Sequence, residues 1–197
     1  YGEDAFAPYL NEKTEGQMYK ILNEKFKDAE KGTAVFVDYK LGEGQLENPL
    51  MWQDFEAVAT GELKSLDGWF ISSTGGTQWK VTSYDDTQYV QYSANGTKGA
   101  CVGWIVTPPI SVAAGDYLGF DVTVGYYNAS CLSVLISENF DGKNVDAASW
   151  TDVTSDFNIP TKPTSGYGTF ASAGKLSLSA YAGKKVYVAF KYVGDGA

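Results

Sequence analysis

The amino-acid sequence predicts an all-β protein, an antiparallel β-sandwich of jelly-roll type with a short N-terminal helix. Short runs of alternating apolar and polar residues fill the chain after residue 32, and this is the two-residue period of a strand. Clusters of Gly, Asn, Asp and Pro separate the runs at short intervals. Aromatic residues make up 15% of the chain, which strands favour. Many short strands at even spacing are typical of a sandwich or barrel.

The N-terminal segment has a different period. Thr14 and Gln17 form a capping box for a helix over residues 14–31. An apolar stripe follows with helical spacing, consisting of Met18, Ile21, Leu22, Phe26 and Ala29. Such a helix docks on its own or a preceding domain, or binds a partner. We therefore predict an N-terminal extension, residues 1–32, and a β-sandwich domain, residues 33–197.

Eleven segments are predicted to be strands or to contain one. They cover residues 33–40, 51–58, 68–73, 78–85, 88–94, 100–107, 117–127, 131–140, 149–157, 168–183 and 184–193. Pro108 and Pro109 lack backbone donors and are expected to end the strand before them. Asn95-Gly96 predicts the positive φ angles of a tight hairpin turn.

The charged residues exclude several functions. The chain has no His, and its 15 basic residues are all Lys. The usual general base and the commonest transition-metal ligand are therefore missing. A net charge of −9 opposes nucleic-acid binding. Paired carboxylates could hydrolyse glycosides without His, but no particular pair stands out, so we expect no enzymatic activity and keep a glycosidase as the minor alternative.

The sequence also bears on the cell compartment. No apolar run approaches the ~20 residues that span a bilayer, so we expect no membrane insertion by this chain. The chain begins at Tyr1 without a signal-peptide pattern, and we expect that a targeting signal has been removed. Cys101 and Cys131 lie in predicted strands. They form a disulfide in an oxidising compartment or are two buried thiols that act as small hydrophobes.

Three stretches carry a resemblance to a known family. They are "WIVTPPI", "LSVLISENFDG" followed by "SWTDVT", and "GKKVYVAFKY". In this order they resemble the choice-of-anchor J / cleaved-adhesin group of β-sandwich domains, which is best represented in surface and secreted proteins of Bacteroidetes. The match covers about residues 53–194. It implies a jelly-roll related to carbohydrate-binding, galactose-binding-like modules, exported as part of a larger surface protein such as an outer-membrane lipoprotein, and it does not imply catalysis.

The resemblance also implies a candidate metal site. Related modules often hold a structural Ca²⁺ between the first and last strands. Asp54 and Glu56 are the early acidic residues here, and alternation would place them on one face of a strand. A solvated pair is the simpler interpretation. Asp85, Asp86, Asp141 and Asp146 are weaker candidates, because they lack the full spacing of a calcium loop.

The resemblance makes the end of the chain unusual. Family members continue past the "FKY" strand into a final strand, whereas this sequence stops at Ala197. We therefore expect the domain to lack its final strand and the strand 186–193 to have a bare edge. The strand predicted at residues 33–40 could cover that edge instead.

Exposed aromatic rings are the candidate ligand site. Rings stack on sugars in water, and six Tyr lie at predicted strand ends or turns: Tyr84, Tyr89, Tyr92, Tyr126, Tyr127 and Tyr167. For any single Tyr, packing on the sheet is the commoner role. Trp69, Trp79, Trp104 and Trp150 match positions that related sandwiches bury. The residues selected for ligand contact are Tyr84, Asp85, Tyr89, Tyr126, Tyr127 and Asn128.

The sequence thus predicts a non-catalytic, exported module of a bacterial surface protein that binds a glycan or a protein. The alternative is a structural spacer with no ligand of its own. Other domains of the same parent protein are the remaining expected partners.

Overall fold

The computed structural model describes residues 49–85 and 87–196. Nearly all of them belong to one unit, Leu50–Ala197. The predicted helix at residues 14–31, the strand at 33–40, the domain boundary between them and Asp86 lie outside the described residues. Among the described residues, no helix is long and apolar enough to cross a membrane.

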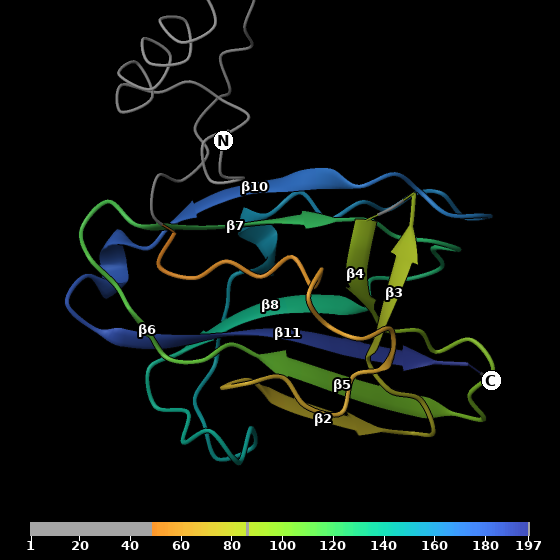
Figure 1. Cartoon of the computed structure of the whole chain (residues 1–197), viewed down its shortest axis with the longest axis horizontal. Coiled ribbons are helices and arrows are strands. Elements are labelled where there is room, and N and C mark those ends of the chain that lie inside the picture. Colours follow the sequence, from red (N-terminus) through yellow and green to blue (C-terminus); the bar gives the residue numbers. More distant parts are fainter. Residues whose placement is uncertain (1–48, 86, 197) are drawn as a thin grey trace, which may run out of the picture. The chain divides into compact units, whose positions relative to one another are not determined.

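The largest layer is a six-stranded antiparallel sheet (Figure 1). Its strand order is β2-β5-β11-β8-β9, and the short strand β6 also pairs with β11. In chain order, these strands are β2 (Phe70–Thr74), β5 (Ala100–Val106), β6 (Ile110–Ser111), β8 (Leu132–Ser137), β9 (Thr151–Asp152) and β11 (Lys185–Asp195).

The last strand, β11, lies in the middle of this sheet. Ala189 pairs with Val106 of β5 on one side and with Leu135 of β8 on the other. The prediction of a bare edge on this strand was therefore wrong. Both partners come earlier in the chain, and the alternation of β11 says nothing about which strands lie beside it.

The second layer consists of two smaller antiparallel sheets. One pairs β7 (Tyr117–Val122) with β10 (Ala171–Ser177), and it lies above the six-stranded sheet in Figure 1. The other has the order β1-β3-β4; its strands β3 and β4 run steeply across the direction of the larger sheet in the same view. Its members are β1 (Gly61–Glu62), β3 (Lys80–Tyr84) and β4 (Thr87–Gln91). The all-β, antiparallel sandwich predicted from the sequence is confirmed.

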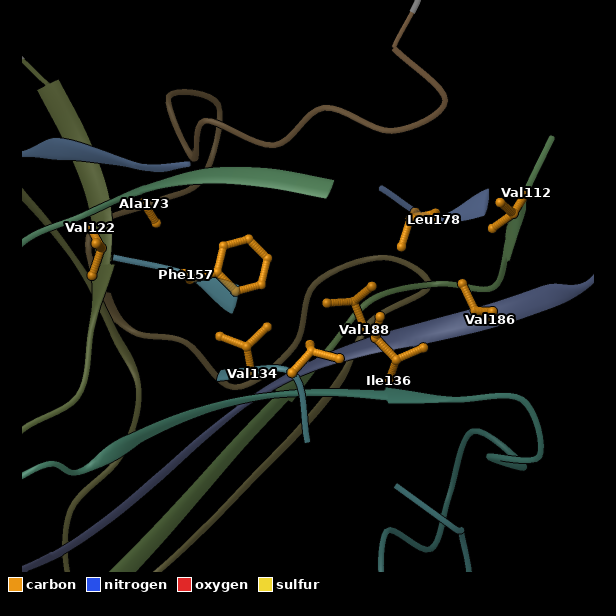
Figure 2. Close-up of a cluster of buried hydrophobic side chains, with 10 residues drawn as sticks. Val112, Val122, Val134, Ile136, Phe157, Ala173, Leu178, Val186 and Val188 are labelled. Atoms are coloured by element: carbon orange, nitrogen blue, oxygen red, sulfur yellow. The ribbon is translucent and has the colours of Figure 1, made fainter. Parts of the chain in front are cut away.

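The main core lies between the two layers. Val186 and Val188 of β11 are fully buried, as the alternation of that strand predicts. Figure 2 shows side chains from the two layers facing one another. This cluster includes Val134, Ile136, Val186 and Val188 from the large sheet and Phe157, Ala173 and Leu178 from the opposite side.

Two further clusters complete the core. One packs the β3–β4 hairpin onto β5, with members Trp79, Val81, Tyr92, Cys101 and Ile105. The other covers the opposite face of the large sheet with the segment after β8, and it includes Trp104, Leu135 and Phe140 with Trp150 packed against them. Trp79 and Trp104 are buried, and Trp69 and Trp150 are half-buried, so all four Trp predicted for the core pack against it.

Residues 51–58 were predicted as a strand, and this was wrong. The segment bends and turns. The Asp54 Oδ1 atom accepts the backbone N–H of Glu56 at 3.1 Å, and Gln53 Oε1 accepts that of Phe55 at 2.6 Å. Short polar side chains that bond their own backbone compete with strand pairing. Asp54 and Glu56 therefore do not share the face of a strand.

The Asn95-Gly96 turn forms, but it does not make a hairpin. The Thr97 N–H donates to the Ala94 carbonyl at 3.0 Å, and Gly96 has a φ of +82°. The turn links β4 to β5, which belong to different sheets. Pro108 and Pro109 follow the end of β5 as predicted.

Some predicted strands are shorter than expected. In the segment 149–157 only Thr151–Asp152 is a strand, and the 3₁₀ turn η2 (Thr154–Asp156) follows. Within 168–183, β10 ends at Ser177, and a second 3₁₀ turn, η3 (Ser179–Tyr181), comes next.

Candidate binding site

Two segments on the second layer form the candidate site. The first follows β7 and contains Tyr126, Tyr127 and Asn128, three of the residues selected from the sequence. The second, residues 162–170, precedes β10. Gly125 and Tyr167 form an antiparallel bridge between them.

Backbone hydrogen bonds tie the segments together. The Tyr126 N–H donates to the Gly166 carbonyl at 2.8 Å, and the Tyr127 N–H donates to the Pro163 carbonyl at 2.8 Å. The Gly168 N–H donates to the Val124 carbonyl at 2.9 Å. These bonds satisfy backbone groups that a loop otherwise leaves to water, and they fix the position of each segment against the other.

Tyr126 and Tyr167 form a perpendicular pair of rings. Their centroids are 5.3 Å apart and their planes meet at 89°, which is the edge-to-face arrangement that the quadrupole of an aromatic ring favours. Both rings remain in contact with solvent, with 60% of Tyr126 and 73% of Tyr167 exposed. Together they form an exposed aromatic corner, which we call the Tyr126–Tyr167 corner.

The backbone at Tyr126 and at Gly125 suits this geometry. Tyr126 has a φ of +50°, a left-handed conformation that is uncommon for a residue with a side chain. The Tyr167 ring lies so close to Gly125 that a Cβ atom there would be 2.5 Å from the Tyr167 Cδ1 atom. Gly125 therefore leaves the space that the Tyr167 ring occupies.

A second ring contact anchors the 162–170 segment to the β3–β4 hairpin. Tyr89 of β4 packs edge-to-face on Phe170, with centroids 5.0 Å apart. Tyr89 is half-buried, so it acts mainly as a support. The contact links a predicted site residue to the same segment that carries Tyr167.

The remaining predicted residues differ in their surroundings. Tyr127 is half-buried, and its hydroxyl lies 3.1 Å from the Ser130 Oγ atom. Asn128 is exposed beside it. Tyr84 ends β3 with 77% of its surface exposed, and Asp85 follows with a φ of +52°. Among the ring pairs of the described residues, none joins Tyr84 to the Tyr126–Tyr167 corner.

Tyr92 and Tyr167 are the two of the six candidate Tyr that were not selected for ligand contact. Tyr92 is buried and packs between Trp79 and Tyr192, with ring centroids 5.0 Å and 4.7 Å away, so it is a core residue. Tyr167 belongs to the corner but was not selected from the sequence. The sequence shows that Tyr167 lies in a Gly-rich turn signal. It does not show that Tyr167 contacts Tyr126, which lies about 40 residues earlier in the chain.

Charge is sparse in the two segments. Residues 123–130 contain no charged side chain, and residues 159–170 contain only Lys162. The whole chain has 24 acidic residues, but none of them lies in these two segments.

The residues proposed for calcium do not assemble a site. Glu56 Oε1 accepts the backbone N–H of Gln88 at 2.8 Å, and Asp54 accepts from Glu56 and from the Trp52 indole. Within the described ranges, no three acidic or other metal-binding side chains come together. Ca²⁺ needs several oxygen ligands, so Asp54 and Glu56 do not fit it by themselves, and calcium binding stays a prediction.

The Asp141 carboxylate also accepts hydrogen bonds from nearby backbone N–H groups. Its Oδ1 atom accepts the N–H groups of Asn144 and Lys143, both at 2.8 Å. These hydrogen bonds hold the pKa of Asp141 below its ordinary value, because they favour the ionised carboxylate. This side chain thus builds the turn that contains Gly142.

Cys101 and Cys131 are both free thiols. Cys101 pairs with Gly194 on one side of β11, and the Cys131 carbonyl accepts the Val193 N–H on the other. Strands that flank a third strand are roughly 10 Å apart, whereas a disulfide needs Cα atoms within about 7 Å. The structure therefore does not support the predicted disulfide. The alternative of two buried thiols holds for Cys101, whereas Cys131 is only half-buried.

Comparisons with known proteins give a limited result. Residues 112–197 match the model of a family described as "Domain of unknown function (DUF5017)". No curated protein matches. Among solved structures, the chain is similar to the K3 cleaved adhesin domain of Lys-gingipain from Porphyromonas gingivalis, with 18% identity and a TM-score of 0.43. That match covers 70% of this chain and 89% of the other. The choice-of-anchor J part of the resemblance stays a prediction.

Proposed function

We propose that this chain is a non-catalytic, adhesin-like module, exported as part of a bacterial surface protein, that binds a glycan or protein through the Tyr126–Tyr167 corner. The observation that carries the proposal is the fixed, perpendicular pair of exposed rings. The parent's other domains are its covalent partners in this proposal, and a lipoprotein anchor on the parent would hold it at the cell surface.

Exposed rings on tied loops are well suited to binding. Aromatic side chains offer a large contact area with few rotatable bonds, and loops held by a rigid scaffold are where binding residues concentrate. The backbone bonds between residues 124–127 and 163–168 order the corner before a ligand arrives. Less entropy is then lost on binding.

The same surroundings favour binding without catalysis. General acid–base chemistry needs a titratable group within hydrogen-bond reach of the reacting atoms. The two segments offer Lys162 and tyrosine hydroxyls but no carboxylate, and the chain has no His. Carboxylate pairs of the glycosidase type would have to come from elsewhere in the sequence.

The test compares binding before and after removal of both rings. The full chain, a Tyr126→Ala/Tyr167→Ala variant and a Tyr84→Ala control would be applied to a glycan array and to an array of immobilised proteins. We expect binding in at least one arm that the double variant loses and the control keeps. A wild-type chain that binds nothing in either arm would favour the spacer.

A further inference from the structure

We infer that the ligand of the Tyr126–Tyr167 corner is an uncharged glycan, with one pyranose ring stacked on an exposed tyrosine face. This inference rests on the proposed binding function and names the chemistry of its ligand. It follows from three properties of the corner: its shape, its sparse charge and the neutral polar side chains in its two segments.

The shape suits a flat, partly apolar ligand. The two rings stand at 89°, so a ligand that stacks on one ring meets the other ring at its side. The axial C–H groups of a pyranose form an apolar face with a slight positive charge, and the face of an aromatic ring is its negative part. A sugar can therefore stack on one tyrosine and contact the second at the same time.

The two segments offer little charge to ligands that depend on ion pairs. An anionic glycan is usually held by Arg forks or by several cations, but the chain contains no Arg and the two segments hold only Lys162. A cationic ligand would find no carboxylate in these segments to pair with. An uncharged ligand needs neither cationic side chains nor carboxylates.

Polar side chains suitable for sugar hydroxyls occur in the same two segments as the rings. Asn128, Thr164, Ser165 and Thr169 are all exposed in the two segments. An amide provides two donors and an acceptor, and a hydroxyl provides one donor and two acceptor sites. This combination of rings and neutral polar groups is typical of small-ligand sites, where a few polar groups set orientation.

The closest competitor is a protein ligand whose Lys or Arg stacks on the same rings. Cations are attracted to the faces of Tyr, and the net charge of −9 would help such a ligand to approach. This interaction weakens as salt is added, whereas stacking of an uncharged sugar does not depend on screening. Salt dependence therefore separates the two ligand classes.

The experiment measures glycan binding by four forms of the full chain. An array of neutral and anionic glycans identifies a bound glycan, and titration calorimetry gives its affinity at low and high salt. The variants are Tyr126→Ala/Tyr167→Ala, Tyr126→Phe/Tyr167→Phe and Tyr84→Ala. Circular dichroism and thermal melts confirm that each variant folds.

We expect binding to at least one neutral glycan, with little change between low and high salt. The double Ala variant should bind at least roughly tenfold more weakly, which corresponds to about 1.4 kcal/mol. The double Phe variant should keep most of the affinity, because the stacking faces remain, and Tyr84→Ala should match the unmodified chain.

Two kinds of result overturn the inference in different ways. Binding only to anionic glycans or to the immobilised proteins, lost in the double Ala variant, would refute the uncharged glycan and leave the proposed binding site intact. Binding that the double Ala variant fully retains would refute the proposed site as well.

Discussion

The ring of Tyr167 lies directly against the α-carbon of Gly125, and a Cβ atom at Gly125 would be 2.5 Å from the Tyr167 Cδ1 atom. Such a distance is far shorter than a carbon–carbon contact of about 3.5–4.0 Å. The absence of a side chain at residue 125 is therefore what lets the Tyr167 ring meet Tyr126.

The substitution Gly125→Ala should disrupt the corner without unfolding the domain. The new methyl group forces the Tyr167 ring away, and the perpendicular contact with Tyr126 is lost. We expect ligand binding to fall about as far as in Tyr167→Ala, with a stability change within about 1 kcal/mol, because the residue is exposed. Unchanged binding by Gly125→Ala would show that the ligand does not use the paired arrangement.

The core on β11 predicts a contrast between two Val residues. Val188 is fully buried and Val193 is 47% exposed on the same strand. Val188→Ala removes buried methyl groups and leaves a cavity, so we expect a loss of about 2 kcal/mol or more. Val193→Ala should cost no more than about 1 kcal/mol. Urea unfolding of the two variants measures both, and equal losses would contradict the assignment of faces.

Stability should fall at alkaline pH because of Tyr192. Burial raises the pKa of Tyr192 to about 12 from its ordinary value of 10.0. The folded protein then holds this proton more tightly than the unfolded chain, so the contribution to stability is complete below pH 10 and is lost as pH rises toward 12.

The variant Tyr192→Phe isolates this effect. It keeps the ring beside Tyr92 but cannot ionise, and it loses the acceptor for the Ala94 N–H. We expect a smaller decline in its unfolding free energy between pH 10 and 12 than in the unmodified chain. Parallel declines would mean that other groups cause the alkaline loss.

The two thiols should remain unlinked and differ in reactivity. Cys101 is fully buried, and Cys131 is partly exposed. Burial raises the pKa of the Cys131 thiol, so little of the reactive thiolate forms. We expect slow labelling of Cys131 by a maleimide and labelling of Cys101 only after unfolding. Mass spectrometry that finds an intramolecular disulfide in the folded chain would contradict the positions of β5, β11 and β8.

The sequence predicts strands well where alternation is long and regular. The alternation from residue 184 onward predicts β11 and its buried face, because side-chain direction in a strand depends only on local geometry. The two-residue strands β1 and β6 are too short to show a period. Residues 51–58 were also predicted to be a strand, but side-chain bonds from Gln53 and Asp54 to the backbone form turns there instead.

The candidate site is only partly predictable for a related reason. Tyr126 and Asn128 could be selected because they follow a strand and precede a turn. Tyr167 and Phe170 become partners of Tyr126 and Tyr89 only through the pairing of distant segments. The central place of β11 and the separation of the cysteines depend in the same way on strand order, which one sequence does not reveal.

The most direct test of the corner is an NMR titration with tyrosine-ring labelling. The neutral glycan identified on the array is added to the folded chain, and single Tyr→Phe variants assign the ring signals. We predict that the signals of Tyr126 and Tyr167 shift together with one dissociation constant, while that of Tyr84 stays in place. Shifts confined to other tyrosines, with Tyr126 and Tyr167 unmoved at saturating glycan, would contradict the account.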